Sequence, residues 1–263
     1  MISADLNPHS VPWWILAPQG TEAQAIAKGL GKTDRIHLQA MPVGATAVQS
    51  FLANLAQTWT AKEKPQGLLV MGVTGSLSAD YDIGQAVWVE QCQYWGNGDH
   101  GQGQEYVGDR RLMDRVNHLL GPEWQIPMVK GITVSEVVCR GEEKELLGKK
   151  SGAQVVDMEN TAVLAFGEAN QIPVAILRVV SDTMAQDLPN LNGVFTEQGA
   201  LQPLPLAKAL LRRPLAAGHL IQGSLKACAQ LTAIAQSLSS SNRGTGKIPR
   251  WWDCGKMLGK QLL

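Results

Sequence analysis

The stretch VVDMENTAVLAFGEANQIPVAILRVVSDT, residues 155–183, decides the fold class. In ENTAVLAFGEAN the apolar residues recur at three- and four-residue spacing, which predicts a helix facing a core, and Pro173 then ends that helix. The run VAILRVV that follows is almost unbroken and rich in β-branched residues, as in a strand covered on both faces. A strand, a helix and a second buried strand in this order predict an α/β domain.

Three charged residues of this stretch, Glu159, Arg178 and Asp182, lie where strands are expected to end. Arg178 interrupts a buried run, so it needs a carboxylate or a ligand beside it. The carboxyl ends of the strands are also where open α/β sheets bind ligands. A plainer interpretation is that Asp157 or Glu159 caps a helix, Arg178 pairs with it, and Ser181-Asp182 start a turn. Taken alone, these residues slightly favour the plainer interpretation.

Length and composition limit the possible classes of protein. The 263 residues suit one large domain over residues 1–238, with C-terminal helices at 205–238 and a linker and tail at 239–263. Lys plus Arg and Asp plus Glu are both 23, so no general attraction for nucleic acid or anionic lipid is expected.

The cysteines and the N-terminus indicate a compartment. Four separated cysteines without a CxxC pair are typical of a reducing compartment, and they exclude a zinc ribbon. Five scattered histidines add no metal-binding spacing, so no metal is expected. The first residues contain no basic leader and no long apolar run, which predicts a cytoplasmic protein.

Three earlier loops also follow expected strands. APQGTE places Glu22 after the first strand, and PVGAT places Gly44 and Thr46 at the start of a helix. Exposed backbone N–H groups at such a helix start suit an anion or a sugar oxygen, although most turns of this kind bind only water. The strand GLLVMG is expected to end in a glycine loop that contains Gly72 and Gly75.

Three further segments need an interpretation. GNGDHG at 96–101 matches GxGxxG, but no apolar helix opens after it, so we interpret it as a flexible loop. The hypothesis of a dinucleotide-dependent oxidoreductase depends on this motif alone. GEEKELLGKKSG is expected to be a charged surface helix with Glu143 and Lys144 on its solvated face. The polar stretch from 183 to about 203 is long enough to be an active-site flap.

Several of these blocks resemble one family. VVDMENTAV followed by VAILRVVSDT resembles the paired signature of the purine nucleoside phosphorylase and uridine phosphorylase superfamily, close to its methylthioadenosine/S-adenosylhomocysteine nucleosidase branch. VMGVTGSLSADYDIG and PQGTEAQ resemble its glycine loop and first loop. The resemblance implies a three-layer α/β/α fold with a central mixed, largely parallel sheet, a homo-oligomer, and cleavage of a purine N-glycosidic bond.

A finer resemblance covers nearly the whole chain. VVCRGEEKELL, DLPNL and LLRRPLAAGHL are similar to the hopanoid-associated branch, whose members release adenine from adenosylhopane. A lipid substrate implies contact with a membrane surface, for which the helices after Pro205 and the tail with Trp251 and Trp252 are the candidates.

The resemblance implies a role for each matching residue. Asp182 would contact N7 of the base, Glu159 would accept the ribose hydroxyls, and Met158 would pack under the sugar. Arg178 would hold Glu159 or the nucleophile, and Glu22 would deprotonate an attacking water. The remaining expected contacts are substrate-binding Gly72, Gly75, Val137, Val138 and Ser181, and a nucleophile or anion site at Gly44 and Thr46.

Two departures from the family pattern leave questions open. Val137 and Val138 stand where the nucleosidases stack an aromatic residue on the base, and Asn160 replaces a small residue after Met-Glu. The altered base-stacking position and the glycine loop, which has Thr74-Gly75-Ser76 where the family has Ala-Gly, leave a non-catalytic nucleoside-binding or lipid-binding protein as the alternative. No cofactor is expected; phosphate is the alternative co-substrate to water, and Glu22 in the first loop favours water because a carboxylate repels a phosphate dianion.

Overall fold

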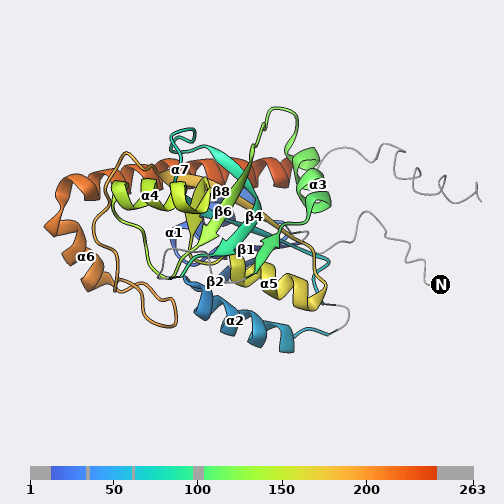
Figure 1. Cartoon of the computed structure of the whole chain (residues 1–263). Coiled ribbons are helices and arrows are strands. Elements are labelled where there is room, and N and C mark those ends of the chain that lie inside the picture. Colours follow the sequence, from blue (N-terminus) through green and yellow to red (C-terminus); the bar gives the residue numbers. More distant parts are fainter. Residues whose placement is uncertain (1–12, 34–35, 61–62, 97–103, 242–263) are drawn as a thin grey trace, which may run out of the picture.

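The computed structural model describes residues 13–33, 36–60, 63–96 and 104–241 (Figure 1). The strands are β1 (Trp13–Pro18), β2 (Ile36–Met41), β3 (Gly67–Ser76), β4 (Ala86–Tyr94), β5 (Glu105–Val107), β6 (Met128–Thr133), β7 (Val155–Asp157) and β8 (Val174–Asp182). The helices are α1 (Thr21–Leu30), α2 (Ala45–Gln57), α3 (Arg110–Leu120), α4 (Gly141–Ser151), α5 (Asn160–Asn170), α6 (Pro203–Arg212) and α7 (Pro214–Ser241).

The sheet is mixed and mostly parallel, which confirms the expected fold class. β1 pairs in parallel with β2 and β3, β3 with β8, and β6 with β4 and β7, whereas β3–β7, β4–β5 and β4–β8 are antiparallel. The pairings from β3 through β8, β4, β6 and β7 return to β3, so these strands form a closed ring. β1 and β2 extend from that ring as an open wing.

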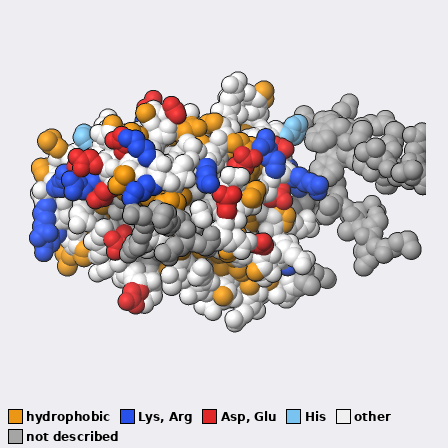
Figure 2. Space-filling view, in the orientation of Figure 1, with side chains coloured by type: hydrophobic (Ala, Val, Ile, Leu, Met, Phe, Trp, Pro, Cys, Tyr) orange, Lys and Arg blue, Asp and Glu red, His pale blue; other side chains and the backbone are white. Residues whose placement is uncertain are grey.

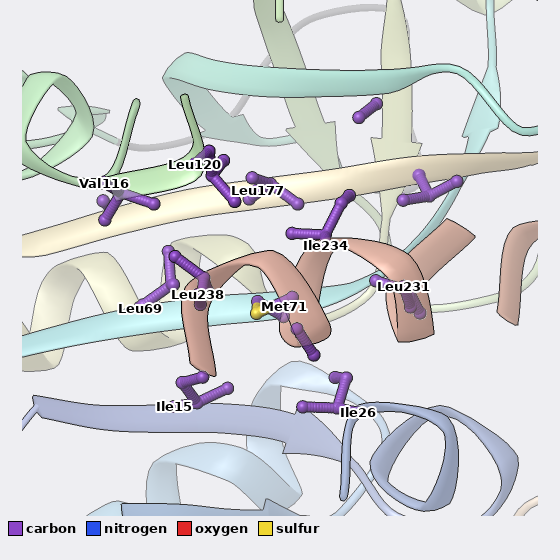
Figure 3. Packing of buried hydrophobic residues seen from close by; sticks show 14 of the residues in the cluster. Ile15, Ile26, Leu69, Met71, Val116, Leu120, Leu177, Leu231, Ile234 and Leu238 are labelled. Carbon is purple, nitrogen blue, oxygen red and sulfur yellow. The ribbon is translucent and has the colours of Figure 1, made fainter. Parts of the chain in front are cut away.

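Helices cover the sheet on two sides, as a three-layer fold requires. Alternate residues of β8 face opposite sides: Leu177 packs with α1, α3 and α7, whereas Ile176 packs with α2 and α5. In the first of these layers Met71 of β3 meets Ile26 of α1 and Ile234 of α7 (Figure 3). All nine residues of β8 are buried, which confirms a strand covered on both faces.

Two local predictions need correction. The glycine segment of residues 72–75 is part of β3 rather than a loop, because β8 pairs with β3 as far as Gly75. The sequence did not predict β5, and of the GNGDHG motif before it only Gly96 lies within the described residues.

The C-terminal part is helical and divided at Pro214, as expected. α7 packs along α1 and β8, while α6 projects from the body with none of its residues buried (Figure 1). In the part of the chain that the structure describes, no helix combines the length and apolarity needed to cross a bilayer.

Candidate functional site

Arg178 is the centre of a buried polar cluster. It follows Ile176 on the side of β8 that faces α5, and its side chain is completely buried. Its Nε and Nη2 donate to Asn160 Oδ1 at 3.0 and 2.5 Å, and Nη2 lies 3.4 Å from Glu159 Oε2. The expectation that Arg178 has a carboxylate beside it is therefore confirmed, and Asn160 is a second partner.

Gly72 allows Glu22 to approach Arg178. A Cβ at Gly72 would lie 2.3 Å from Arg178 Nη1 and 2.7 Å from Glu22 Oε2, so any side chain there would separate them. The backbone N–H of Val73 donates to the same Glu22 oxygen at 2.7 Å. Burial raises the pKa of Glu22 to about 7, against the opposing effects of Arg178 and the Val73 hydrogen bond. A carboxylate with this pKa is suited to act as a base near neutral pH.

Asp157 and Glu159 divide two tasks at the start of α5. Asp157 Oδ1 accepts from the backbone N–H groups of Glu159 and Asn160 at 2.8 and 2.7 Å, so Asp157 caps the helix. Glu159 is thereby free to bind elsewhere: its Oε1 accepts from the Gly44 N–H at 2.9 Å. Burial raises the pKa of Glu159, and the charge of Arg178 opposes that rise. The plainer interpretation is thus correct for Asp157, while Glu159 belongs to the cluster.

Asp182 lies at the end of β8, where the pairing with β3 shifts register. Val180 pairs with Thr74 but Asp182 pairs with Gly75, so Ser181 is an extra residue that redirects the strand end. Ser181 Oγ donates to Asp182 Oδ1 at 2.7 Å. A Cβ at Gly75 would lie 3.0 Å from Asp182 Oδ2, so this glycine gives the carboxylate its space.

The other partner of Asp182 is Lys144, and here the sequence-based expectation was wrong. Lys144 is completely buried and its Nζ forms an ion pair with Asp182 Oδ2, instead of lying on a solvated face. α4 packs closely because Gly141 and Gly148 face its neighbours: a Cβ there would lie 2.3 Å from Met184 O and 2.5 Å from Leu77 O, respectively. Lys144 comes three residues after Gly141, a spacing that places both on one side of the helix.

A cavity of about 720 Å³ lies beside this cluster. Of the predicted site residues, Gly44, Thr46, Val137 and Met158 line it. The other predicted residues are not among its lining: Glu22, Gly72, Gly75, Val138, Glu159, Arg178, Ser181 and Asp182. Gly44 connects the two groups, since it lines the cavity while its N–H binds Glu159.

Aromatic residues that the sequence did not reveal also line this cavity. They are Tyr94 at the end of β4, Tyr106 of β5 and Phe195 of the segment between β8 and α6. A smaller cavity of about 380 Å³ is lined by Val138 and Trp95 and shares Val137 with the first. The two cavities therefore offer aromatic rings, although Val137 and Val138 are aliphatic.

The segment predicted as a flap, residues 183–202, forms one wall of the larger cavity. It is held at both ends of its span: Leu188 N–H donates to Cys139 O at 2.7 Å, and Gly199 O accepts from Gln19 Nε2 at 2.9 Å. It thus joins the loop before α4 to the loop after β1. Within the described ranges, no His, Cys, Asp or Glu side chains gather in a group that could hold a metal ion.

Comparison with known proteins gives a consistent result for the fold. The family model described as the phosphorylase superfamily matches residues 30–212. Futalosine hydrolase of Helicobacter pylori superposes with a TM-score of 0.65 at 14% identity, over 88% of this chain and 97% of that one. A 5′-methylthioadenosine/S-adenosylhomocysteine nucleosidase of the same organism has a TM-score of 0.63 at 15% identity, over 88% and 98%. No curated protein matches in sequence.

Proposed function

Because the chain belongs to the phosphorylase superfamily, we propose that it cleaves the N-glycosidic bond of a purine nucleoside. The observation that carries this proposal is the meeting of Glu22 after β1, Glu159 after β7 and Arg178 within β8, beside a cavity with aromatic walls. Bond cleavage builds positive charge on the ribose and negative charge on the departing base. Two carboxylates at the sugar and a third, Asp182, at the base match that separation of charge.

Each residue has a distinct task in this proposal. Glu22 takes a proton from the attacking water. Glu159 accepts hydrogen bonds from the ribose hydroxyls with the carboxylate lone pairs that Gly44 and Arg178 do not use. Arg178 is buried and holds both carboxylates in place without touching the substrate. Asp182 stabilises the departing base. No cofactor is part of the proposal.

Water rather than phosphate is the proposed nucleophile. The Gly44 N–H at the start of α2, the expected anion site, is already taken by the carboxylate of Glu159. Glu22 adds a second carboxylate nearby, and two carboxylates disfavour a bound phosphate dianion. This arrangement supports hydrolysis.

We expect the purified full chain to release adenine from adenosine or a 5′-modified adenosine without added phosphate. Asp182→Asn is expected to lower that rate a hundredfold or more with the fold intact, which is the range of general-acid effects. Chromatographic measurement of free adenine, with circular dichroism as a control, checks both. Strict dependence on phosphate contradicts hydrolysis, and nucleoside binding without any release supports the non-catalytic alternative.

The finer proposal concerns the substrate and where it is met. The similarity of VVCRGEEKELL, DLPNL and LLRRPLAAGHL to the hopanoid-associated branch supports an adenine nucleoside with an apolar 5′ substituent, such as adenosylhopane. We propose that the protein acts in the cytoplasm and meets this lipid at a membrane surface. A homo-oligomer stays a prediction.

α6 and the start of α7 offer a surface for that contact. Leu204, Leu211 and Leu215 are 84%, 82% and 84% exposed, and Lys208 and Arg212 lie among them. Lys and Arg side chains lie beside hydrophobic ones over α6 at the left edge of Figure 2. From residue 198 to residue 252 the sequence contains no Asp or Glu. Exposed leucines beside basic residues, in a helix without acidic residues, are typical of a helix that lies on an anionic bilayer.

Replacing the three leucines Leu204, Leu211 and Leu215 by Ser is expected to weaken binding to phosphatidylglycerol liposomes tenfold or more, because apolar contact with the bilayer is lost. Liposome co-sedimentation measures this, with Val107→Ser as the control because Val107 is 64% exposed on β5. Equal binding of both variants contradicts the role of α6. Trp251 and Trp252 lie outside the described residues, and deletion of residues 239–263 tests them separately.

A further inference from the structure

Lys144 occupies a place where lysine is rarely found. Its side chain is 1% exposed, although lysine normally keeps its ammonium group in water. Besides the ion pair with Asp182 Oδ2, its Nζ donates to Thr183 O at 3.3 Å. Gly141 and Gly148 bring this face of α4 against the backbone of Met184 and Leu77. The fold therefore places the Lys144 ammonium group against Oδ2 of the Asp182 carboxylate.

Both oxygens of Asp182 are already engaged. Oδ2 accepts from Lys144 and Oδ1 accepts from Ser181 Oγ at 2.7 Å, so the carboxylate is held as an acceptor. The thiol of Cys139 interacts electrostatically with both members of the pair and with Glu143. Burial raises the pKa of the Cys139 thiol, and Glu143 is exposed to solvent. The departing base nevertheless needs a proton, because a purine anion is a poor leaving group.

We propose that Lys144 is a positioning residue for leaving-group departure: it fixes the Asp182 carboxylate and supplies the proton that Asp182 passes to the base. This inference rests on the proposed function and deepens it. As the C–N bond breaks, its electron pair goes to the base, Lys144 gives a proton to the Asp182 carboxylate, and Asp182 passes a proton to a ring nitrogen, which leaves Lys144 neutral and Asp182 again ionised. The attacking water forms the new C–O bond and gives its proton to Glu22, so one proton returns from Glu22 to Lys144 through solvent after each turnover.

Stability alone does not account for this pair. A buried ion pair is often no more stabilising than apolar residues of the same volume, because both charges must leave water. A purely structural role and the proposed role also differ in what they predict. A structural defect slows every substrate, whereas a missing proton supply slows only substrates whose leaving group needs a proton.

The test compares two leaving groups with wild type, Lys144→Met and Lys144→Arg. Met has a similar length and no charge, and Arg restores the charge. Lys144→Met is expected to lower adenine release a hundredfold or more but to change release of p-nitrophenolate from p-nitrophenyl β-ribofuranoside less than threefold, since that anion leaves unprotonated. Lys144→Arg is expected to recover part of the loss. In the Asp182→Asn background Lys144→Met is expected to add no further loss. An equal loss with both substrates, or no loss with adenine, overturns the proposal.

A binding measurement keeps the inference testable if wild type releases no adenine, in which case the proposed function fails separately. Titration calorimetry with adenine and with 7-deazaadenine, which lacks N7, reports whether the pair provides a proton to the base. Wild type is expected to bind adenine at least tenfold more tightly, and Lys144→Met is expected to bind both equally. No preference in wild type, or the same preference in the variant, overturns the role of Lys144.

Discussion

Glu22→Gln is expected to lower turnover by a hundredfold to ten-thousandfold and at the same time to stabilise the folded protein above pH 7. The loss of turnover follows from the base role, which an amide does not perform. The gain in stability has a separate cause. Burial raises the pKa of Glu22 from 4.5 to about 7, so the folded state holds a proton on this group that the unfolded state has already lost.

The sign of the effect follows from proton linkage. Between pH 4.5 and about 7 the folded state binds more protons at Glu22 than the unfolded state, so rising pH lowers the free energy of unfolding. At about 1.4 kcal/mol per pH unit, the difference amounts to at most about 3.5 kcal/mol, and contact of Glu22 with solvent makes it smaller. Glu22→Gln removes this penalty. The variant is expected to equal wild type near pH 4.5 and to exceed it at pH 8.

Urea denaturation at pH 5 and pH 8, together with adenine release from pH 5 to 9, measures both effects. Wild-type kcat/KM is expected to rise through a pH near 7 as Glu22 loses its proton, a rise that the variant lacks. Glu63→Gln is the matched control: Glu63 is exposed, and hydrogen bonds from Thr60 lower its pKa. That substitution is not expected to stabilise the protein at pH 8. If Glu22→Gln destabilises the protein at pH 8, burial does not disfavour the ionised form of Glu22.

The cluster around Arg178 was predictable because its determinants are local in sequence. A charge in a buried run demands a partner, and the acidic residues Glu159 and Asp182 follow strand ends that the topology brings to one edge. The helix of residues 160–170 was predictable from its apolar spacing. The family resemblance added Glu22, which is distant in sequence.

What the sequence did not reveal depends on packing between distant segments. The charges around Lys144 in GEEKELLGKK are typical of a solvated helix, and only the closely packed glycine face shows which lysine is buried. The two glycines seven residues apart were the available signal. Gly72 and Gly75 suggested a loop because glycine is common in loops, whereas here they give space to Glu22, Arg178 and Asp182 within a strand.

The aromatic lining of the cavity shows the same limit. Tyr94 of β4 and Tyr106 of β5 come from consecutive strands, whereas Phe195, in the segment before α6, is far from both along the chain. The pairing of β4 with β5 places Tyr106 opposite Cys92, two residues before Tyr94. Because a short strand and an irregular segment provide two of these rings, no periodic pattern marked them.

Arg178→Met is expected to lower the free energy of unfolding at pH 8 by about 3–5 kcal/mol, the usual cost of removing one partner from a buried ion pair. The fully buried guanidinium serves Glu159, Asn160 and the Val73 carbonyl, and its charge lowers the pKa values of Glu22 and Asp157 as well. Without it, carboxylates that are already costly to ionise lose their buried cation.

The effect of Arg178→Met is expected to shrink toward pH 5, because Glu22 is protonated there and a neutral carboxyl does not need the cation. Urea denaturation at both pH values measures it, with Arg110→Met as the control. Arg110 is 58% exposed and pairs with Glu90 at 3.2 Å, so its loss is expected to cost less than about 1 kcal/mol. Similar losses in the two variants, or a loss for Arg178→Met that does not depend on pH, contradict the view that Arg178 supports ionised carboxylates. A pH-dependent loss instead ties the ionisation of Glu22, and with it the proposed base, to one buried cation.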